Sequence, residues 1–458
     1  MAQVQDSSDD RDQARAALPS FGQAARLWLK IGCLSFGGPA GQIAMLHHEV
    51  VDQRRWISNG RFLHALNFCS LLPGPEAQQL ATYLGWLMHG ARGGLAAGAL
   101  FVIPGALVMM GLSAIYALYG AVPLISSLFF GLKCAVLVMV VEALLRVGKR
   151  ALKGPNAYLL AALAFLALFL FGLPFPLVVM LAGCCGLLAP HAFKAGTHGQ
   201  TANGDEALLD RLMRHDPAHA ANLARSAYRA GWIALVLWTA SLIVLLPQGG
   251  VFADIGWFFS KMAVVTFGGA YAVLAYVAQE AVNLYHWLSP SEMLAGLGLA
   301  ETTPGPLILV LQFVGFLAGF RADTLVQGLW GGILGALLTL WVTFTPCFAF
   351  VFLGAPMIEK AQNNPRLTGA LAAITCAVVG VIANLALWFG LRVLFADMTL
   401  WQWGAVSFEW PVMASLNPAA LLIAVLAAGS LFGFKLGIVR TLALCSLSGL
   451  VLHWAAVI

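Results

Sequence analysis

Nine long apolar runs constrain this chain more than any other feature of its sequence. Each is close to the ~20 apolar residues that a helix needs to cross a bilayer. The runs cover residues 94–118, 122–147, 156–173, 175–190, 230–247, 326–353, 369–394, 415–433 and 437–457. Because backbone polar groups in lipid must be paired within their own segment, the runs predict helices. We therefore predict an all-α, polytopic membrane protein.

The composition excludes a water-soluble enzyme. Only 10% of the 458 residues are charged and 60% are hydrophobic, whereas soluble domains are about 25% charged. The eight cysteines are scattered through apolar runs without the spacing of a metal site, so we expect neither a metal nor any other cofactor. The net charge of +5 is modest and does not indicate nucleic-acid binding.

The positions of lysine and arginine predict which side each loop faces. Basic residues follow the run that ends at 147, and they recur in 191–229, 354–367 and 434–440. The loops between them are uncharged or acidic. With alternating spans, every basic loop faces the cytoplasm, as the positive-inside rule requires. This predicts a cytoplasmic N-terminus and a periplasmic C-terminus.

The polar stretches divide the chain. Residues 1–20 are polar and of mixed charge, which predicts a disordered tail. Residues 191–229 form a cytoplasmic linker with a short helix near 205–214, followed by a linking transmembrane helix at 230–247. The four histidines of the linker (191, 198, 215 and 219) could ligate a metal, but a solvated loop is the better interpretation.

An internal repeat relates residues 21–190 to residues 248–458. Without gaps, residues 231 positions apart match over some fifty positions: Lys30 with Lys261, Ser35 with Thr266, Phe36-Gly37-Gly38 with Phe267-Gly268-Gly269, Trp56 with Trp287, and Pro73-Gly74-Pro75 with Pro304-Gly305-Pro306. Chance similarity between apolar segments would match leucine and alanine instead. Because the additional helix 230–247 carries the chain outward, the two repeats are predicted to have inverted topology, as in many secondary transporters.

Each repeat opens with two apolar stretches that are broken near their centres. Repeat one has 21–48, broken at Gly37-Gly38-Pro39, and 60–90, broken at Pro73-Gly74-Pro75; repeat two has 252–279, broken at Gly268-Gly269, and 292–320, broken at Pro304-Gly305-Pro306. Proline and glycine interrupt a helix. The stretches could span the membrane or re-enter. Re-entrant hairpins keep the basic loop after the first stretch inside, and we favour them.

The breaks form the predicted substrate site. Half-helices that start near residues 39, 75, 270 and 306 would have their N-termini at mid-membrane, where each carries about +0.5 charge and free N–H groups. Converging N-termini would bind an anion. The glycines and prolines of all four breaks are therefore candidate binding residues.

Polar residues near the breaks supply further candidates. Lys30 and Lys261 precede the glycine pairs by two turns and could contact the anion or extend to the interface. Lys133 and Glu142 lie in one run, and either could line the path. The hydroxyls of Ser35, Thr266, Thr302 and Thr303 could donate to an oxyanion or cap their own helices.

Two glutamates and three glutamines complete the set. Glu76 and Glu301 flank the two Pro-Gly-Pro breaks and could carry a coupling proton, although Glu76 could simply cap a helix. Gln78, Gln79 and Gln312 could line the path or bond between helices. No clustered nucleophile, metal site or nucleotide-binding loop is present in the sequence, so we expect no enzymatic activity.

These motifs resemble a known family. Phe-Gly-Gly-Pro at 36–39, Trp56, Leu-Pro-Gly-Pro at 72–75, Thr-Phe-Gly-Gly at 266–269 and Thr-Thr-Pro-Gly-Pro at 302–306 are similar to the chromate ion transporter family in its long, two-domain form. One departure is Gly-Gly-Ala-Tyr at 268–271, which lacks the proline of repeat one.

The resemblance implies export of chromate across the bacterial inner membrane, and hence chromate resistance. Sulfate is the competing tetrahedral oxyanion, and the driving force is the membrane potential or a proton gradient. The alternative is a permease for sulfate or another oxyanion, or an anion channel. The partners expected are a small oxyanion and the lipid bilayer, with no nucleic acid. A homodimer is left open.

Overall fold

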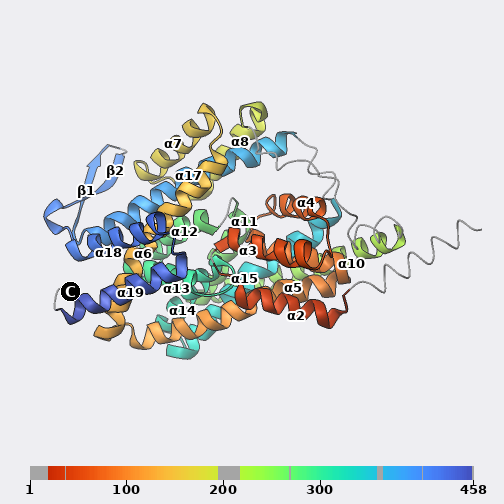
Figure 1. Ribbon diagram of the computed structural model, residues 1–458, viewed down its shortest axis with the longest axis horizontal. Coiled ribbons are helices and arrows are strands. Elements are labelled where there is room, and N and C mark those ends of the chain that lie inside the picture. Colours follow the sequence, from red (N-terminus) through yellow and green to blue (C-terminus); the bar gives the residue numbers. More distant parts are fainter. Residues whose placement is uncertain are drawn as a thin grey trace, which may run out of the picture.

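The computed structural model describes residues 19–36, 38–193, 217–267, 270–357, 365–404 and 406–455. Gly37, Gly268 and Gly269, and the helix predicted near 205–214, lie outside these residues. The described chain is almost entirely helical, which confirms the all-α class (Figure 1). Five described helices are long and apolar enough to cross a membrane, and several shorter apolar helices accompany them.

The first half of the chain contains two broken stretches followed by long helices. Its elements are α2 (Phe21–Leu34), α3 (Gly38–His47), the π-helical turn η1 (His48–Gln53), α4 (Asn59–Cys69), α5 (Glu76–Tyr119), α6 (Pro123–Ala151), α7 (Pro155–Phe169), α8 (Phe175–Leu188) and the 3-10 turn η2 (Pro190–Ala192). The helix α10 (Pro217–Leu245) and the 3-10 turn η3 (Leu246–Gln248) then lead to the second half.

The elements of the second half follow a similar order of helices and add a β-hairpin. They are α11 (Gly250–Val265), α12 (Ala270–Gln279), the π-helical turn η4 (Glu280–Leu284), α13 (Pro290–Thr302), the 3-10 turn η5 (Leu307–Leu309), α14 (Val310–Arg321), α15 (Gly328–Gly354), η6 (Ala355–Met357), α17 (Pro365–Leu394), β1 (Met398–Trp403), β2 (Val406–Pro411), η7 (Met413–Ser415), α18 (Pro418–Ala428), η8 (Gly429–Gly433) and α19 (Ile438–Trp454). The breaks therefore fall where glycine and proline predict them.

Local structure recurs at the spacing of the sequence repeat. Each first broken stretch ends in a π-helical turn, and the turn leads to a residue with positive φ, Arg55 in one half and His286 in the other, both at 50°. Ser58 and Ser289, again 231 positions apart, cap α4 and α13 by accepting a hydrogen bond from the backbone N–H three residues later. These two pairs of equivalent residues thus have equivalent conformations in the two halves.

The continuous element α5 is in fact two helices that fold back on each other. His89 and Gly90 have non-helical dihedral angles, and the φ of 63° at Gly90 suits glycine. Gly85 lies against Gly93 and Ala97. The first part of α5, residues 76–88, is therefore a half-helix that returns from the break and packs against the long second part.

In the second half, α14 and α15 make the same arrangement through a longer loop. Gly315 packs against Gly335 and Thr339, and Gly319 packs against Gly331, which places the two helices antiparallel. Small residues at such contacts let two backbones approach closely, which is how helices associate in lipid. A short returning half-helix packed on a long helix is thus common to both halves.

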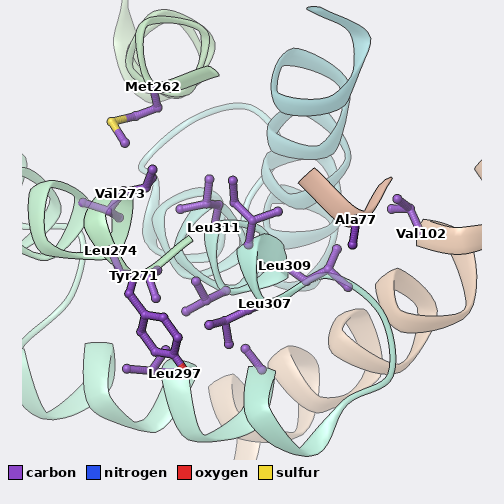
Figure 2. Packing of buried hydrophobic residues seen from close by; sticks show 14 of the residues in the cluster. Ala77, Val102, Met262, Tyr271, Val273, Leu274, Leu297, Leu307, Leu309 and Leu311 are labelled. Carbon is purple, nitrogen blue, oxygen red and sulfur yellow. The ribbon is translucent and has the colours of Figure 1, made fainter. Parts of the chain in front are cut away.

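The two halves interlock. The second part of α5 contacts α14 and α15, and α6 contacts α13, α17 and α19. In Figure 1 the green and teal helices of the second half lie among the orange helices of the first. Figure 2 shows Ala77 and Val102 of α5 in one buried cluster with Met262, Leu297 and Leu309 of the second half. The breaks therefore lie at an interface between halves.

One element was not predicted from the sequence. The loop after α17, which the sequence analysis left without structure, contains the antiparallel hairpin β1–β2, with Met398 opposite Pro411 and Trp403 opposite Val406. Its turn contains Gly404 at a φ of 61°. The hairpin bonds to the helical body through Ser407 N–H and the carbonyl of Leu170.

We expect Gly105→Ala to lower the free energy of unfolding by about 1–3 kcal/mol, which is typical of overpacking. Gly105 lies in α5, and a Cβ there would overlap the carbonyl oxygen of Pro304 in the second half. The midpoint of thermal unfolding in detergent measures the effect. Gly111→Ala in the same helix is the matched control, since nothing lies within 4 Å of its Cβ position. Equal midpoints for the two variants would contradict the packing described here.

Candidate functional site

The four breaks bond to each other in two reciprocal pairs. The N–H of Gly74 donates to the carbonyl of Thr266 at 2.9 Å, and the N–H of Gly305 donates to the carbonyl of Ser35 at 3.0 Å. Donors and acceptors are both 231 positions apart, so the second bond is the first with the halves exchanged. Such reciprocal contacts are what a two-fold relation between like surfaces produces.

Glycine is required at these junctions. Gly38, Gly74 and Gly305 have φ values of 72°, 126° and 90°, which residues with a Cβ rarely adopt. A side chain at Gly74 would also approach the amide nitrogen of Gln79 to 2.7 Å and the sulfur of Cys347 to 2.8 Å. The backbone of this break is therefore pressed against both its own half-helix and α15.

The prolines define where the half-helices start. Pro39 is the second residue of α3. Pro75 and Pro306 are the residues before α5 and η5, in extended conformations, and Pro73 and Pro304 precede the glycines. A proline lacks an N–H, which costs nothing at a position where the helix has no acceptor for it.

The hydroxyls predicted near the breaks all bond to their own helices. Ser35 Oγ donates to Ile31 O at 2.6 Å, and Thr266 Oγ1 donates to Met262 O at 2.5 Å. Thr302 and Thr303 donate to Leu299 and Ala300 at 2.8 and 3.0 Å. In this conformation these side chains therefore stabilise helix ends, which is the local alternative that the sequence left open.

Four buried glutamines near the breaks donate hydrogen bonds, three to backbone carbonyls and one to a side-chain hydroxyl. Gln42 Nε2 donates to Gly305 O at 2.5 Å, and Gln79 Nε2 donates to Pro73 O at 2.7 Å. Gln312 Nε2 donates to Ala106 O at 2.9 Å, and Gln78 Nε2 donates to Thr82 Oγ1 at 3.1 Å. The sequence analysis missed Gln42, although a glutamine four residues after Gly38 in an apolar stretch is a usable signal.

Several buried oxygens in this region have no hydrogen-bond partner among the described residues. They are Gln78 Oε1, Gln79 Oε1, Gln312 Oε1, Glu301 Oε2 and Thr343 Oγ1. An unpaired buried polar group costs about 1–3 kcal/mol, and such groups concentrate at functional sites. The interior around the breaks therefore contains acceptor atoms that no described residue pairs.

The paired lysines lie in different environments. Lys30 Nζ is 2.7 Å from Glu49 Oε1, and its side chain is 49% exposed. Lys261 lies over the rings of Phe258 and Tyr276, at 5.8 and 5.4 Å from their centroids. The structure therefore shows neither ammonium group in contact with a described break residue.

The remaining ionisable candidates have different bonding partners. Lys133 of α6 bonds to Ser291 at the start of α13. Glu142 pairs with Arg146 on the same helix, with Oε1 to Nε at 3.0 Å. Glu76 is the first residue of α5, where a carboxylate stabilises a helix N-terminus.

Glu301 is buried against Tyr271, whose hydroxyl donates to Oε1 at 2.5 Å. The sequence analysis did not single out Tyr271, although it lies in the Gly-Gly-Ala-Tyr departure from the first repeat.

A separate cavity of about 250 Å³ lies away from the breaks. Residues of α7, α8, α12 and α17 line it together with the β1–β2 hairpin. At its wall, Arg392 bonds to both carboxylate oxygens of Glu409 at 2.6 Å and lies over the ring of Trp388. No group of His, Cys, Asp or Glu side chains that could hold a metal occurs in the described parts of the chain.

Long apolar helices, interlocked halves and broken helices that meet in a polar interior define a multi-pass membrane protein. The chain belongs to the chromate transporter family, whose model matches residues 22–187 and 253–450. The family resemblance predicted from the sequence is thereby confirmed. No solved structure matches the chain.

Curated relatives cover most of the chain. The chromate transport protein of Pseudomonas aeruginosa is 33% identical over 381 residues, which is 81% of this chain and 82% of the relative. A probable chromate transport protein of Synechococcus elongatus is 24% identical over 91% of this chain and 96% of its own length. The chromate transport protein of Cupriavidus metallidurans is 25% identical over 79% of this chain and 80% of its own length.

We expect Glu49→Gln to lower stability at pH 7 but not in acid. Glu49 lies in η1, well after the break of the first stretch. Burial raises its pKa, but hydrogen bonds from Lys30 and Arg54 outweigh this and lower the pKa below 4.5. The ionised carboxylate therefore stabilises the fold above about pH 4.5, and this contribution is lost as the pH falls further. Because Lys30 is half exposed, the effect at pH 7 is about 1 kcal/mol or less.

Thermal unfolding of Glu49→Gln, Lys30→Gln and the double variant at pH 7 and at about pH 3 checks this ion pair. The two single effects should add incompletely at pH 7, since both remove the Lys30–Glu49 pair, whereas Glu49→Gln also removes the pair with Arg54. Additive effects, or a difference from the parent protein that persists in acid, would contradict the assignment.

Proposed function

We propose that this protein is a secondary transporter that exports chromate across the bacterial inner membrane. The observation that carries the proposal is the match to the chromate transporter family over both halves, together with relatives named as chromate transport proteins. Chromate is a tetrahedral dianion, so its site needs hydrogen-bond donors and positive charge. Broken helices supply both at membrane depth.

The proposed substrate site lies at the breaks. The half-helices that start at Gly38, Glu76, Ala270 and Leu307 leave N–H groups free for an anion, as helix N-termini do in phosphate sites. Lys30 and Lys261 lie before two of these breaks and add positive charge when their side chains turn toward them. The hydroxyls of Ser35, Thr266, Thr302 and Thr303 complete the coordination if they exchange their intrahelical bonds for the anion.

Transport would follow from a change in the reciprocal contacts between halves. We propose that the halves have inverted topology, with the N-terminus in the cytoplasm and the C-terminus in the periplasm. Rocking one half against the other would then open the site to each side in turn. The bonds Gly74–Thr266 and Gly305–Ser35 support this proposal, because equivalent contacts can exchange at little cost.

A permease for sulfate, or an anion channel, is the alternative in the same class. Sulfate has the same shape and charge as chromate, so donors at the breaks do not distinguish the two by geometry alone.

Flux in vesicles tests the proposed function. Purified protein in liposomes loaded with unlabelled chromate should take up external labelled chromate in a saturable way, and chromate should compete better than sulfate, phosphate or molybdate. Saturable counterflow is expected of a carrier, because one site binds on each side in turn. Flux that rises linearly with concentration and follows the membrane potential would indicate a channel instead, and preference for sulfate would indicate the permease.

Replacing both Lys30 and Lys261 by glutamine should weaken chromate binding at least about tenfold, because a close charge contributes roughly 1.4 kcal/mol or more. Equilibrium binding to the purified protein measures the effect. Lys149→Gln with Lys153→Gln is the matched control, since these lysines lie near the end of α6 away from the breaks. Unchanged affinity in the Lys30 and Lys261 variant would remove both lysines from the site.

Single cysteines test the inverted topology. With the exposed cysteines Cys33, Cys184 and Cys185 replaced, Asp52→Cys and Asn283→Cys should be labelled by an impermeant maleimide from opposite sides of the membrane, because η1 and η4 would face opposite sides. Right-side-out and inside-out vesicles provide the comparison. Labelling of both positions from the same side would contradict inverted, re-entrant halves.

A further inference from the structure

Glu301 is the least exposed carboxylate among the described residues, at 3%. It lies at the end of α13, directly before the break Thr302–Pro306. The same break contains Gly305, whose N–H bonds to Ser35 of the other half. A carboxyl group is thus buried next to the contact that we propose changes during transport.

The two oxygens of this carboxyl group have unequal partners. Oε1 accepts a hydrogen bond from the Tyr271 hydroxyl at 2.5 Å, whereas Oε2 is buried without a partner. An ionised carboxylate buried with one hydrogen bond is costly, whereas a proton on Oε2 removes the charge. The geometry therefore leaves one place for a proton, on the oxygen that Tyr271 does not occupy.

The groups that face Glu301 come from two other elements. Tyr271 belongs to α12, and the ion pair Glu142–Arg146 of α6 acts on Glu301 electrostatically. Arg146 is the only cation among these groups, and Glu142 neutralises much of its charge. When Glu301 loses its proton, Tyr271 and Arg146 are the groups that stabilise the resulting carboxylate.

The unpartnered atom is an acceptor, which decides the class of ligand. A fully ionised oxyanion offers only acceptors, so it cannot bond to Oε2 while Glu301 is ionised. The other unpaired side-chain oxygens near the breaks, such as Gln79 Oε1 and Gln312 Oε1, are acceptors as well. The ligand that fits Oε2 is a proton, delivered by water.

The halves differ at this position. The residues that precede Glu301 and Tyr271 by 231 positions are Ser70 and Ala40, so neither the carboxyl group nor the phenol recurs at the equivalent positions of the first half. Because the Glu301–Tyr271 pair occurs in one half only, each copy of the chain has one such pair.

We propose that Glu301 is a proton-binding residue of the transport cycle and that Tyr271 positions it. The inference rests on the proposed function and names its coupling site. In one state, a proton leaves Oε2 for a water molecule on the cytoplasmic side, and the carboxylate keeps the hydrogen bond from Tyr271. In the other state, Oε2 takes a proton from water on the periplasmic side. Proton entry is thereby coupled to oxyanion export.

The test separates coupling from chromate binding. Liposomes containing the protein, with the membrane potential clamped at zero, are assayed for chromate accumulation driven by an acidic interior and for chromate exchange without a pH gradient. Glu301→Gln should lose ΔpH-driven accumulation at least about tenfold while exchange stays within about twofold. Asp323→Asn, an exposed carboxylate in the loop between α14 and α15, is the matched control and should retain both.

The outcomes are distinct. If Glu301→Gln accumulates chromate like the parent protein, the inference is wrong. It is also wrong if accumulation by the parent protein depends on sodium instead of ΔpH. A parent protein that exchanges chromate but ignores ΔpH also overturns it and leaves the proposed function intact. If the parent protein shows no chromate exchange, the proposed function itself is contradicted.

A second variant keeps the inference testable if Glu301→Gln does not fold. Tyr271→Phe should shift the pH profile of ΔpH-driven accumulation to higher pH, because the carboxylate loses its hydrogen-bond donor. Glu301→Asp should restore part of the ΔpH-driven accumulation. A pH profile of Tyr271→Phe equal to that of the parent protein would show that the tyrosine packs against Glu301 without affecting its proton.

Discussion

The structure depends on backbone hydrogen bonds that each half makes with the breaks of the other. A broken helix in lipid exposes N–H and C=O groups that water cannot reach, so another part of the protein must satisfy them. Gly74 and Gly305 donate across the interface to Thr266 and Ser35, and Gln42 adds a side-chain bond to Gly305. These bonds join the two halves directly at their breaks.

Close backbone contacts make these bonds possible. Glycines pack each returning half-helix on its long partner, in α5 for the first half and between α14 and α15 for the second. Gly105 and Cys347 then place the long helices directly against the breaks of the opposite half. Because the hydrophobic effect does not drive helices together in lipid, this packing carries much of the association.

The halves share a backbone but differ in their polar side chains. Lys30 pairs with Glu49, whereas Lys261 lies over Tyr276, which also interacts with Glu280. Glu301 and Tyr271 have no counterparts in the first half. Two halves with similar backbones supply a symmetric framework for alternating access. Different polar side chains would let one half take up a function that the other lacks.

The sequence by itself determined the helices, their breaks and the family, because apolar length and Gly/Pro interruptions act locally. The tertiary structure decided which breaks meet, that the hydroxyls of Ser35 and Thr266 bond to their own helices, and that Tyr271 reaches Glu301. It also decided that the chain after α17 forms a hairpin. The meeting of the breaks and the bond from Tyr271 to Glu301 depend on contacts between residues far apart in the chain, as between Gln42 and Gly305, which no local pattern of residues encodes. The hydroxyl bonds are local, but the sequence left two partners open for each hydroxyl and the fold decided between them.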